Sequence, residues 1–214
     1  MRTIVFAAIT ALTTTVMLAG TSLPGVTPGA RTFKLNNAVG KNAIKFISKA
    51  PAEDINGTAD GVTGSFEFDP GNIEAAKGTV DVAVRSMKTA ISKRDDHMYS
   101  SVWLDADTYP TITFKLTRIE NVTVSTNGQQ PTVIARAIGT FTLHGVTKPF
   151  QAPINLTYVK SSTETKKRSG GDLVALKVNF EIFLKDFNVK GKEGVIGKSV
   201  GEKITCEVDL FANS

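Results

Sequence analysis

Residues 92–114 read SKRDDHMYSSVWLDADTYPTITF, and they mark the point where a short helix gives way to a β-strand. The polar start of this stretch predicts a helix over about residues 91–103, with Ser92 as the N-cap and Asp95 as the acid of a capping box. Backbone sterics before Pro110 disfavour the α conformation, so the helix is expected to end before this residue. The alternating apolar residues that follow predict a strand.

The same alternation of apolar and polar residues runs through the chain after residue 30 and is typical of half-buried strands. Turn residues separate the runs, as in DPGN at residues 69–72, where proline fixes one dihedral angle and glycine accepts a positive φ. We expect another turn at residues 56–60 and a bend or bulge at Gly139. The predicted strands cover residues 43–50, 62–68, 77–87, 111–119 with a continuation over 121–125, 133–143, 150–160, 173–184 and 203–212.

About eight antiparallel strands with short turns form either two packed sheets or a closed barrel, because both arrangements leave few exposed edges. A barrel of about eight strands encloses an interior wide enough for one small ligand. A helix placed before the strand that starts near residue 111 would cover one end of such a barrel. The residues alone leave the choice between barrel and sandwich open.

Two segments carry a resemblance to a known family. Residues 92–114 and GTFTLHGVTKPF at residues 139–150 resemble the two characteristic segments of the YceI-like family of periplasmic, lipocalin-shaped lipid binders. The likeness continues through FEIFLKDF at residues 180–187 and covers roughly the chain after residue 30. It implies an all-β fold, an eight-stranded antiparallel lipocalin-like β-barrel with the short helix near one end. It also implies a long apolar ligand inside, such as a polyisoprenoid, an isoprenoid quinone or a fatty amide or acid.

The resemblance further implies where such a lipid would bind. The Arg-Asp-x-His helix of the family lies at the mouth of the lipid tunnel, so Arg94 is a candidate partner for a phosphate, and His97 for a quinone carbonyl or a phosphate oxygen. The alternative is that both residues pin the helix to the barrel rim by hydrogen bonds. Trp103 is bulkier than the usual aromatic residue at its position, so we expect it to narrow the tunnel or to shift its lipid preference. The predicted tunnel wall, unless these residues form a filled core, is Phe66, Phe68, Val82, Val84, Phe114, Phe141 and Phe180.

The net charge is +5 and the isoelectric point about 9.3, but the basic residues are scattered, which speaks against a nucleic-acid partner. The one tight basic cluster, residues 166–168, lies among serines and glycines and is typical of a solvated hairpin loop, with contact to a lipid headgroup as the alternative. The single cysteine, Cys206, lies in an alternating segment and is predicted to be a small buried apolar residue rather than a reactive thiol.

Residues 1–30 are predicted to be a signal peptide and short leader, followed by one domain over residues 31–214. Only one side chain in the first segment is charged, and an apolar run follows it. That run is short for a membrane span, which needs about 20 apolar residues. Small residues fit a cut after Thr21 or Ser22, and a cut at Ala30 stays open. The protein is therefore expected in the periplasm or secreted.

The residues offer little for catalysis. The two histidines, His97 and His144, lie in distant segments, and no HExxH, CxxC or GxSxG motif occurs. The leading interpretation is a carrier or scavenger that sequesters a lipid, requires no cofactor and changes no bond. The alternatives are a non-enzymatic envelope interaction or stress protein with a filled core and, less favoured, an enzyme that acts through His97 or Cys206. A homodimer and a transient membrane contact stay open, and no metal site is expected.

Overall fold

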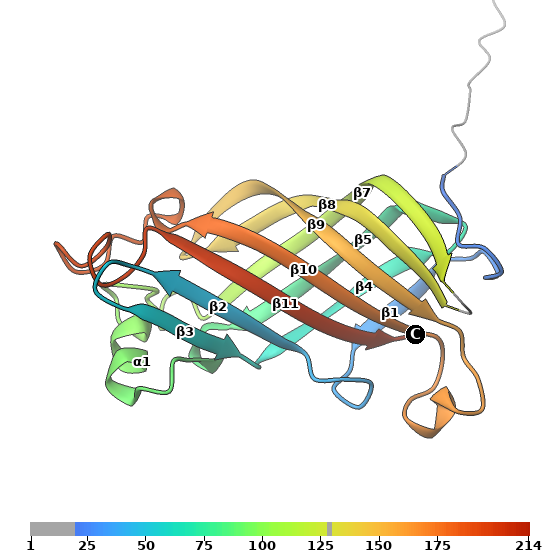
Figure 1. Ribbon diagram of the computed structural model, residues 1–214, viewed down its shortest axis with the longest axis horizontal. Helices are drawn as coiled ribbons and strands as arrows, with labels where there is room; N and C mark the ends of the chain where they lie inside the picture. The colour runs from blue at the N-terminus through green and yellow to red at the C-terminus, as the bar shows by residue number, and fades with distance from the viewer. Residues whose placement is uncertain (1–19, 128–129) are drawn as a thin grey trace, which may run out of the picture.

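The computed structural model describes residues 20–127 and 130–214, and its strands run obliquely along an elongated barrel (Figure 1). The helix α1 (Ser92–Tyr99) lies at one end of the long axis, and the C-terminus lies toward the other. We refer to these as the α1 end and the far end. Residues 1–19, most of the predicted signal peptide, lie outside the described residues.

The strands follow the alternating runs of the sequence. In β8, Val133 and Ala135 face the interior, whereas Ile134 and Arg136 face solvent. Three 3-10 turns, η1 (Val84–Ser86), η2 (Thr165–Lys167) and η3 (Leu184–Phe187), interrupt the connections. The strands are β1 (Arg31–Leu35), β2 (Ala43–Lys49), β3 (Asp54–Ala59), β4 (Val62–Asp69), β5 (Asn72–Ala83), β6 (Met87–Lys88), β7 (Thr111–Asn127), β8 (Gln130–Leu143), β9 (Val146–Val159), β10 (Leu173–Phe183) and β11 (Lys203–Asn213).

Eight of these strands close into an antiparallel barrel, which confirms the predicted fold. The order of neighbours is β1-β4-β5-β7-β8-β9-β10-β11, and β1 also pairs with β11, which completes the circuit. The short strand β1 pairs with both of its neighbours: Phe33 lies opposite Phe66 of β4, and Lys34 lies opposite Asn213 of β11. Closure removes the unpaired edges that an open sheet of this size would expose.

Three further strands extend the sheet at the α1 end. β2 pairs with residues 204–209 of β11, β3 pairs with β2, and β6 pairs with β3. The turn predicted at residues 56–60 is wrong, because most of it lies in β3. Asparagine and glycine weaken the strand signal there, but a Cβ at Gly57 would lie 2.0 Å from the ring of Phe46. The close approach of this ring explains a glycine in the middle of a strand.

The bend predicted at Gly139 is confirmed. The register between β7 and β8 shifts opposite this residue, between Leu116 and Arg118. A Cβ on Gly139 would lie 2.1 Å from the carbonyl oxygen of Lys115, so the two backbones approach more closely than a larger residue allows.

The helix α1 is shorter than predicted. It ends at Tyr99 rather than near residue 103, because Ser100 adopts an extended conformation. The Oγ of Ser100 donates a hydrogen bond to the carbonyl oxygen of His97 (2.7 Å), and a series of turns follows.

The start of α1 also differs from the prediction. Ile91 occupies the N-cap, and no side chain among the described residues caps the helix, so the prediction of Ser92 as the cap is wrong. Asp95 is not a capping-box acid either. Its Oδ1 accepts hydrogen bonds from the backbone N (2.8 Å) and the Oγ1 (2.6 Å) of Thr89. Through these bonds the buried Asp95 ties the first turn of the helix to the segment before it.

Apolar side chains fill the two ends of the barrel differently. At the far end, Phe33, Phe68 and Tyr158 are fully buried, with ring centroids 6.0–6.2 Å apart. At the α1 end, a separate apolar cluster that includes Leu104 and Phe187 packs under the helix and the turns after it. The interior between these two clusters is only partly filled.

Candidate ligand-binding cavity

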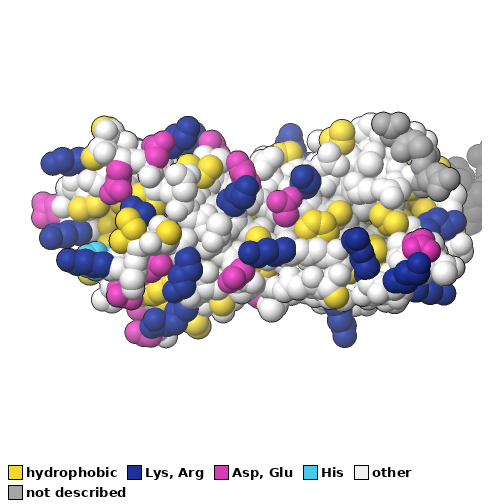
Figure 2. All heavy atoms as spheres, turned by 60° about the horizontal axis from the view of Figure 1, so that its bottom comes forward, with side chains coloured by type: hydrophobic (Ala, Val, Ile, Leu, Met, Phe, Trp, Pro, Cys, Tyr) yellow, Lys and Arg dark blue, Asp and Glu magenta, His cyan; other side chains and the backbone are white. Residues whose placement is uncertain are grey.

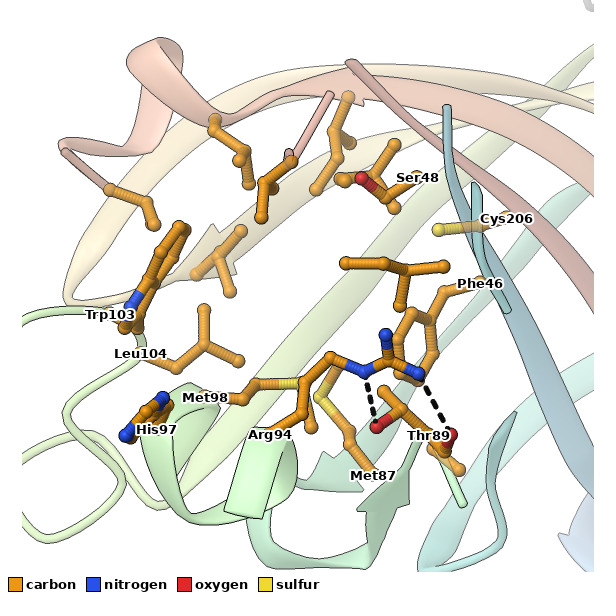
Figure 3. A pocket seen from close by; sticks show the side chains of 18 of the residues that line it. Phe46, Ser48, Met87, Thr89, Arg94, His97, Met98, Trp103, Leu104 and Cys206 are labelled. Atoms are coloured by element: carbon orange, nitrogen blue, oxygen red, sulfur yellow. Dashed lines mark hydrogen bonds between the residues drawn. The ribbon is translucent and has the colours of Figure 1, made fainter. Parts of the chain in front are cut away.

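A cavity of about 510 Å³ occupies the α1 end of the barrel (Figure 3). Its walls come from β2, β3, β5 to β8, β10 and β11, from α1 and the turn after it, and from the loop over residues 188–202. Exposed side chains belong to its lining, among them His97 and Ile91, which is 51% exposed, so the cavity reaches the surface at this end. Its volume falls within the range of about 300–1,000 Å³ that small-molecule sites occupy.

The polar groups of this cavity gather at the α1 end, and the rest of its wall is apolar. Four of them, Ser48, Glu53, Thr89 and Arg94, already have partners inside the protein. The Oγ of Ser48 accepts a hydrogen bond from the backbone N of Gly201 (2.8 Å), and the Oγ1 of Thr89 donates one to Asp95 (2.6 Å). The polar side chains of the lining are Ser48, Glu53, Thr89, Lys93, Arg94, His97 and Ser199.

A second cavity of about 130 Å³ lies deeper in the barrel, toward the far end. Thr79 is the one polar side chain among the described residues that line it. Both cavities share the side chains of Ile44, Val82, Ile112, Phe141 and Phe180. The two spaces therefore adjoin across these side chains, and we refer to the pair, which reaches from the α1 end into the middle of the barrel, as the passage.

The structure brings nine of the ten predicted site residues to these cavities. Ligand contact by them stays a prediction, but their placement fits one continuous site. Val82, Phe141 and Phe180 line both cavities, Arg94, His97 and Trp103 line the first, and Phe66, Phe68 and Phe114 line the second.

Val84 is the exception and does not belong to the wall. It is 1% exposed, lies outside both linings and packs in the cluster of Leu104 and Tyr99. The alternation of β5 ends at Ala83, where the turn η1 begins, so Val84 does not follow Val82 toward the cavity. The prediction assumed a period of two beyond the point where the strand stops.

Several wall residues were missed from the sequence. Ile182 follows Phe180 inward on β10, and Cys206 faces the cavity from β11; a strict extension of the alternation would have found both. Met98 and Val195 also line the cavity, but they lie on α1 and in the loop over residues 188–202. Their positions depend on how these segments fold over the barrel, for which a strand pattern carries no signal.

The guanidinium group of Arg94 is held at the rim by three hydrogen bonds. Its Nε donates to Thr89 Oγ1 (2.9 Å), its Nη2 donates to the carbonyl oxygen of Thr89 (3.2 Å), and its Nη1 donates to Glu53 Oε2 (2.9 Å). Figure 3 shows the side chain reaching from α1 toward Thr89. These bonds connect α1 to the turn between β2 and β3, which favours the rim-pinning role over a headgroup contact for Arg94.

His97 and Trp103 lie on the same side of the cavity as Met98 and Leu104 (Figure 3). His97 is exposed, and Trp103 is half-buried. A Cβ at Gly191 would lie 2.6 Å from Cη2 of Trp103, so the ring lies against the loop over residues 188–202. Trp103 therefore bridges the two segments that frame the mouth, which fits the expectation that it narrows the passage.

Cys206 lies in the wall as a buried thiol. Burial raises the pKa of this thiol to about 12, so the neutral form prevails at physiological pH. Thiolate, rather than thiol, is the reactive species, and the environment of Cys206 suppresses it.

The described residues give two further results. Within residues 20–127 and 130–214, no group of three or more His, Cys, Asp or Glu side chains is arranged to hold a metal ion. In the same part of the chain, no helix is both long and apolar enough to cross a membrane. Figure 2 shows basic, acidic and hydrophobic side chains interspersed over one face of the barrel.

A closed antiparallel barrel with an apolar cavity that opens at one end defines the class of β-barrels built around an interior site. Within that class, the chain belongs to the YceI-like family, because the model of the YceI-like domain matches residues 35–212. This match spans the circuit of strands apart from residues 31–34 of β1 and the last residue of β11, Asn213.

Curated bacterial relatives carry the name UPF0312 protein. One from Vibrio cholerae is 32% identical over 136 residues, which cover 64% of this chain and 65% of the relative. The chain therefore matches just under two thirds of the length of that relative. One from Yersinia enterocolitica is 30% identical over 190 residues, which cover 84% of this chain and 92% of the relative.

Solved structures show the same fold at low sequence identity. BcnA of Burkholderia cenocepacia has a TM-score of 0.64 at 18% identity and covers 84% of this chain and 99% of its own. The YceI protein of Campylobacter jejuni has a TM-score of 0.60 at 20% identity, covering 78% and 88%. A polyisoprenoid binding domain from Saccharophagus degradans, implicated in plant cell wall breakdown, has a TM-score of 0.60 at 15% identity, covering 85% and 98%.

Proposed function

We propose that this protein binds a long-chain apolar lipid inside its barrel and carries or sequesters it in the bacterial envelope. The ligand class is a polyisoprenoid, an isoprenoid quinone or a fatty amide or acid. The observation that carries the proposal is the pair of adjoining apolar cavities, of about 510 and 130 Å³, whose polar side chains gather at one end. This arrangement matches a molecule with an apolar tail and a single polar head.

Burial of the tail would supply the affinity. Each methylene group removed from water contributes about 0.8 kcal/mol, and a chain of some tens of carbons therefore exceeds the cost of ordering the ligand. The wall is already folded around the cavity, which lowers that cost further. No step in this mechanism makes or breaks a bond, so the proposed role is binding and not catalysis.

The polar head would lie beside α1. Lys93 and His97 line the cavity there, whereas the guanidinium of Arg94 is already bonded to Glu53 and Thr89. A lysine ammonium and an imidazole suit a phosphate, a carboxylate or a carbonyl oxygen. We therefore assign the head to Lys93 and His97 rather than to Arg94.

Two considerations from outside the cavity support the proposal. The Saccharophagus degradans domain of the same fold is described as binding a polyisoprenoid. The predicted signal peptide would place this protein in the periplasm or outside the cell. The alternative of an interaction protein with a filled core fits the structure less well, because the interior holds open space. A homodimer and a transient membrane contact are compatible with this role and stay predictions.

The test is to produce the full chain in a bacterial host, extract the purified protein with organic solvent and analyse the extract by mass spectrometry. A stoichiometric isoprenoid or long acyl chain is the expected result. A clean extract that stays clean after incubation with polyprenyl lipids and quinones would overturn the proposal.

A matched pair of variants ties any bound lipid to the cavity. Cys206→Phe places a ring in the first cavity, because the side chain of Cys206 faces it. Glu207→Phe adds the same ring to the exposed outer face of the same strand. The first variant is expected to lose most of the lipid and the second to keep it; equal lipid content in both would place the lipid elsewhere.

A further inference from the structure

Residues 20–30, which the sequence assigned to a leader, pack against the far end of the barrel. Leu23 is 2% exposed and Val26 is 8% exposed. Both belong to the same apolar cluster as Phe68 and Tyr158, the ring layer that fills this end. Figure 1 shows the segment at the end of the barrel opposite α1. A leader that is discarded has no reason to bury two apolar side chains in the core of the mature fold.

Backbone hydrogen bonds fix one side of this segment to the turn between β4 and β5. The N of Leu23 donates to the carbonyl oxygen of Pro70 (2.7 Å), and the N of Ile73 donates to the carbonyl oxygen of Thr21 (3.0 Å). The carboxylate of Glu74 accepts hydrogen bonds from the N (2.8 Å) and the Oγ1 (2.5 Å) of Thr21. The segment thus continues the hydrogen-bonding pattern of the sheet at this turn.

Basic side chains hold the segment on its other side. Lys160 Nζ, just after β9, donates to the carbonyl oxygen of Gly25 (2.8 Å), and Arg31 Nη2 donates to the carbonyl oxygen of Thr27 (2.8 Å). The same guanidinium bonds Tyr158 through Nη1 (2.6 Å). Because Lys160 and the turn between β4 and β5 lie in different parts of the circuit, the segment spans the far end rather than following one strand.

We infer that this segment stays in the exported protein as a plug over the far end, and that the signal peptide is cut after Thr21 or Ser22. The inference rests on the proposed export and lipid binding. A cut at Ala30 would remove both Leu23 and Val26. A cut after Thr21 or Ser22 removes Thr21 with its hydrogen bonds to Ile73 and Glu74, but it leaves Leu23, Val26 and the bond from Leu23 N to Pro70 in place. A cut after Ser22 also has small residues, Gly20 and Ser22, at the two positions that a signal peptidase reads.

A plugged far end makes the passage a blind pocket. The second cavity is lined by Phe68, and behind it lie the buried rings of Phe33 and Tyr158 and then the plug. A lipid would therefore enter tail first from the α1 end and leave by the same opening. The blind end would also limit the length of tail that the protein accepts, whereas a barrel open at both ends would thread a longer chain.

The first experiment is to export the full chain in a bacterial host and determine the N-terminus of the processed protein by intact mass and N-terminal sequencing. A chain that begins at Ser22 or Leu23 is expected. A chain that begins at Arg31, or one that retains Met1, would overturn the assignment. This readout does not depend on lipid, so it can succeed or fail separately from the proposed function.

The second experiment tests the plug in the full chain with Val26→Asp against Thr27→Asp. The first change puts a carboxylate into the apolar cluster, and the second places it on an exposed neighbour. Val26→Asp is expected to lower Tm by about 5–10 °C, a shift typical for a buried charge in a domain of this size, and to broaden the range of tail lengths in the lipid extract. Thr27→Asp should leave both unchanged.

The outcomes of this experiment distinguish the plug from the proposed lipid binding. Equal Tm values and equal lipid profiles for the two variants would overturn the plug, even if lipid is bound. A Tm loss confined to Val26→Asp, with no lipid in any extract, would retain the plug as a structural element and refute the lipid-binding proposal.

Discussion

Both ends of the barrel are lined by apolar, largely aromatic side chains, but these side chains fill the far end and surround a cavity at the α1 end. At the far end, Phe33, Phe68 and Tyr158 are packed ring against ring and are fully buried. At the α1 end, aromatic side chains such as Phe141 and Phe180 surround open space. Apolar residues therefore stabilise the fold where they touch each other and form a binding site where they do not.

The polar groups differ between the ends in the same way. At the far end, Arg31, Tyr158 and Asp172 form a closed set: Arg31 Nη1 lies 3.1 Å from Asp172 Oδ2, and the Tyr158 hydroxyl donates to that same oxygen (2.5 Å). Burial and the bond to Asp172 raise the pKa of Tyr158, so it stays a neutral donor. At the α1 end, Lys93 and His97 line the cavity, where a ligand head can reach them. We therefore expect stability to depend on the far end and binding on the α1 end.

The sharpest test of this division compares one phenylalanine from each end. Phe33→Ala removes a ring that is 0% exposed and stacks on Phe66, with centroids 5.4 Å apart. We expect it to lower the free energy of unfolding by about 3–5 kcal/mol, as for other buried aromatic residues. Phe180→Ala should lower the free energy of unfolding by less than about half of that. Part of the Phe180 ring faces a cavity, so this part makes no contacts with protein atoms that the substitution could remove. Urea denaturation measures both.

The same pair should behave in the opposite order in a lipid assay. Phe180→Ala changes the wall shared by both cavities and is expected to alter the amount or length of bound lipid. Phe33→Ala should leave the amount of bound lipid close to wild type at temperatures where the variant is folded, because Phe33 lines neither cavity. Similar stability losses and similar lipid profiles for the two variants would contradict the division between the ends.

The second comparison breaks one ion pair at each end. Asp172→Asn removes the charge that Arg31 and Tyr158 share in a largely buried setting, and we expect a loss of about 1–3 kcal/mol. Glu53→Gln weakens the bond to Arg94 at the rim, where the Glu53 side chain is 49% exposed, and the loss should stay below about 1 kcal/mol. Thermal unfolding at pH 7 gives both values. A larger loss for Glu53→Gln would show that the rim carries more of the stability than its exposure indicates.

The third test concerns the mouth. Trp103→Ala removes the ring that lies against Gly191, and so it separates the turn after α1 from the loop over residues 188–202. Because Trp103 is only half-buried, we expect a stability loss of about 1 kcal/mol or less, but release of a fluorescent fatty acid at least several-fold faster. Stopped-flow exchange measures the release rate, and Trp103→Phe is the control that retains a ring. Unchanged release from Trp103→Ala would show that the mouth is framed without this contact.

The contrast between the ends also explains which features the sequence predicted. Alternation located eight strand runs, because each strand has one face toward the interior. It missed β1 and β6, which are short, and β3, where Gly57 makes room for the Phe46 ring. These strands depend on neighbours far away in the chain, and a local pattern does not contain that information.

For the site, the sequence predicted which residues face inward but not which of them touch open space. Val84 and Phe180 were both predicted as wall, yet Val84 packs in the cluster of Leu104 and Tyr99, and Phe180 borders both cavities. Phe33 was not predicted at all, although it is central to the ring layer at the far end. A filled core and a cavity wall need the same apolar side chains, so only the packing between strands distinguishes them.

The smallest expected effect concerns Asp69, whose carboxylate helps to hold the plug at the far end. Its Oδ1 accepts hydrogen bonds from the backbone N of Gly71 (2.7 Å) and of Gly29 (2.8 Å). Backbone hydrogen bonds from Gly29 and Gly71 hold the pKa of Asp69 below its ordinary value of 3.8. Because the folded-state pKa is the lower one, this contribution is fully present above about pH 4 and is lost as the pH falls through the folded-state value.

Asp69→Asn should therefore lower Tm slightly at pH 6, and the difference from wild type should shrink progressively below pH 4, as the wild-type carboxylate becomes protonated on the way down through its lowered pKa. Asp54→Asn, at an exposed carboxylate at the start of β3 near the α1 end, is the matched control. A thermal scan at each pH measures the differences. A Tm difference for Asp69→Asn that stays constant from pH 6 to pH 3 would show that the bonds to Gly29 and Gly71 do not depend on the charge. The plug would then be held by the burial of Leu23 and Val26, without a contribution from this carboxylate.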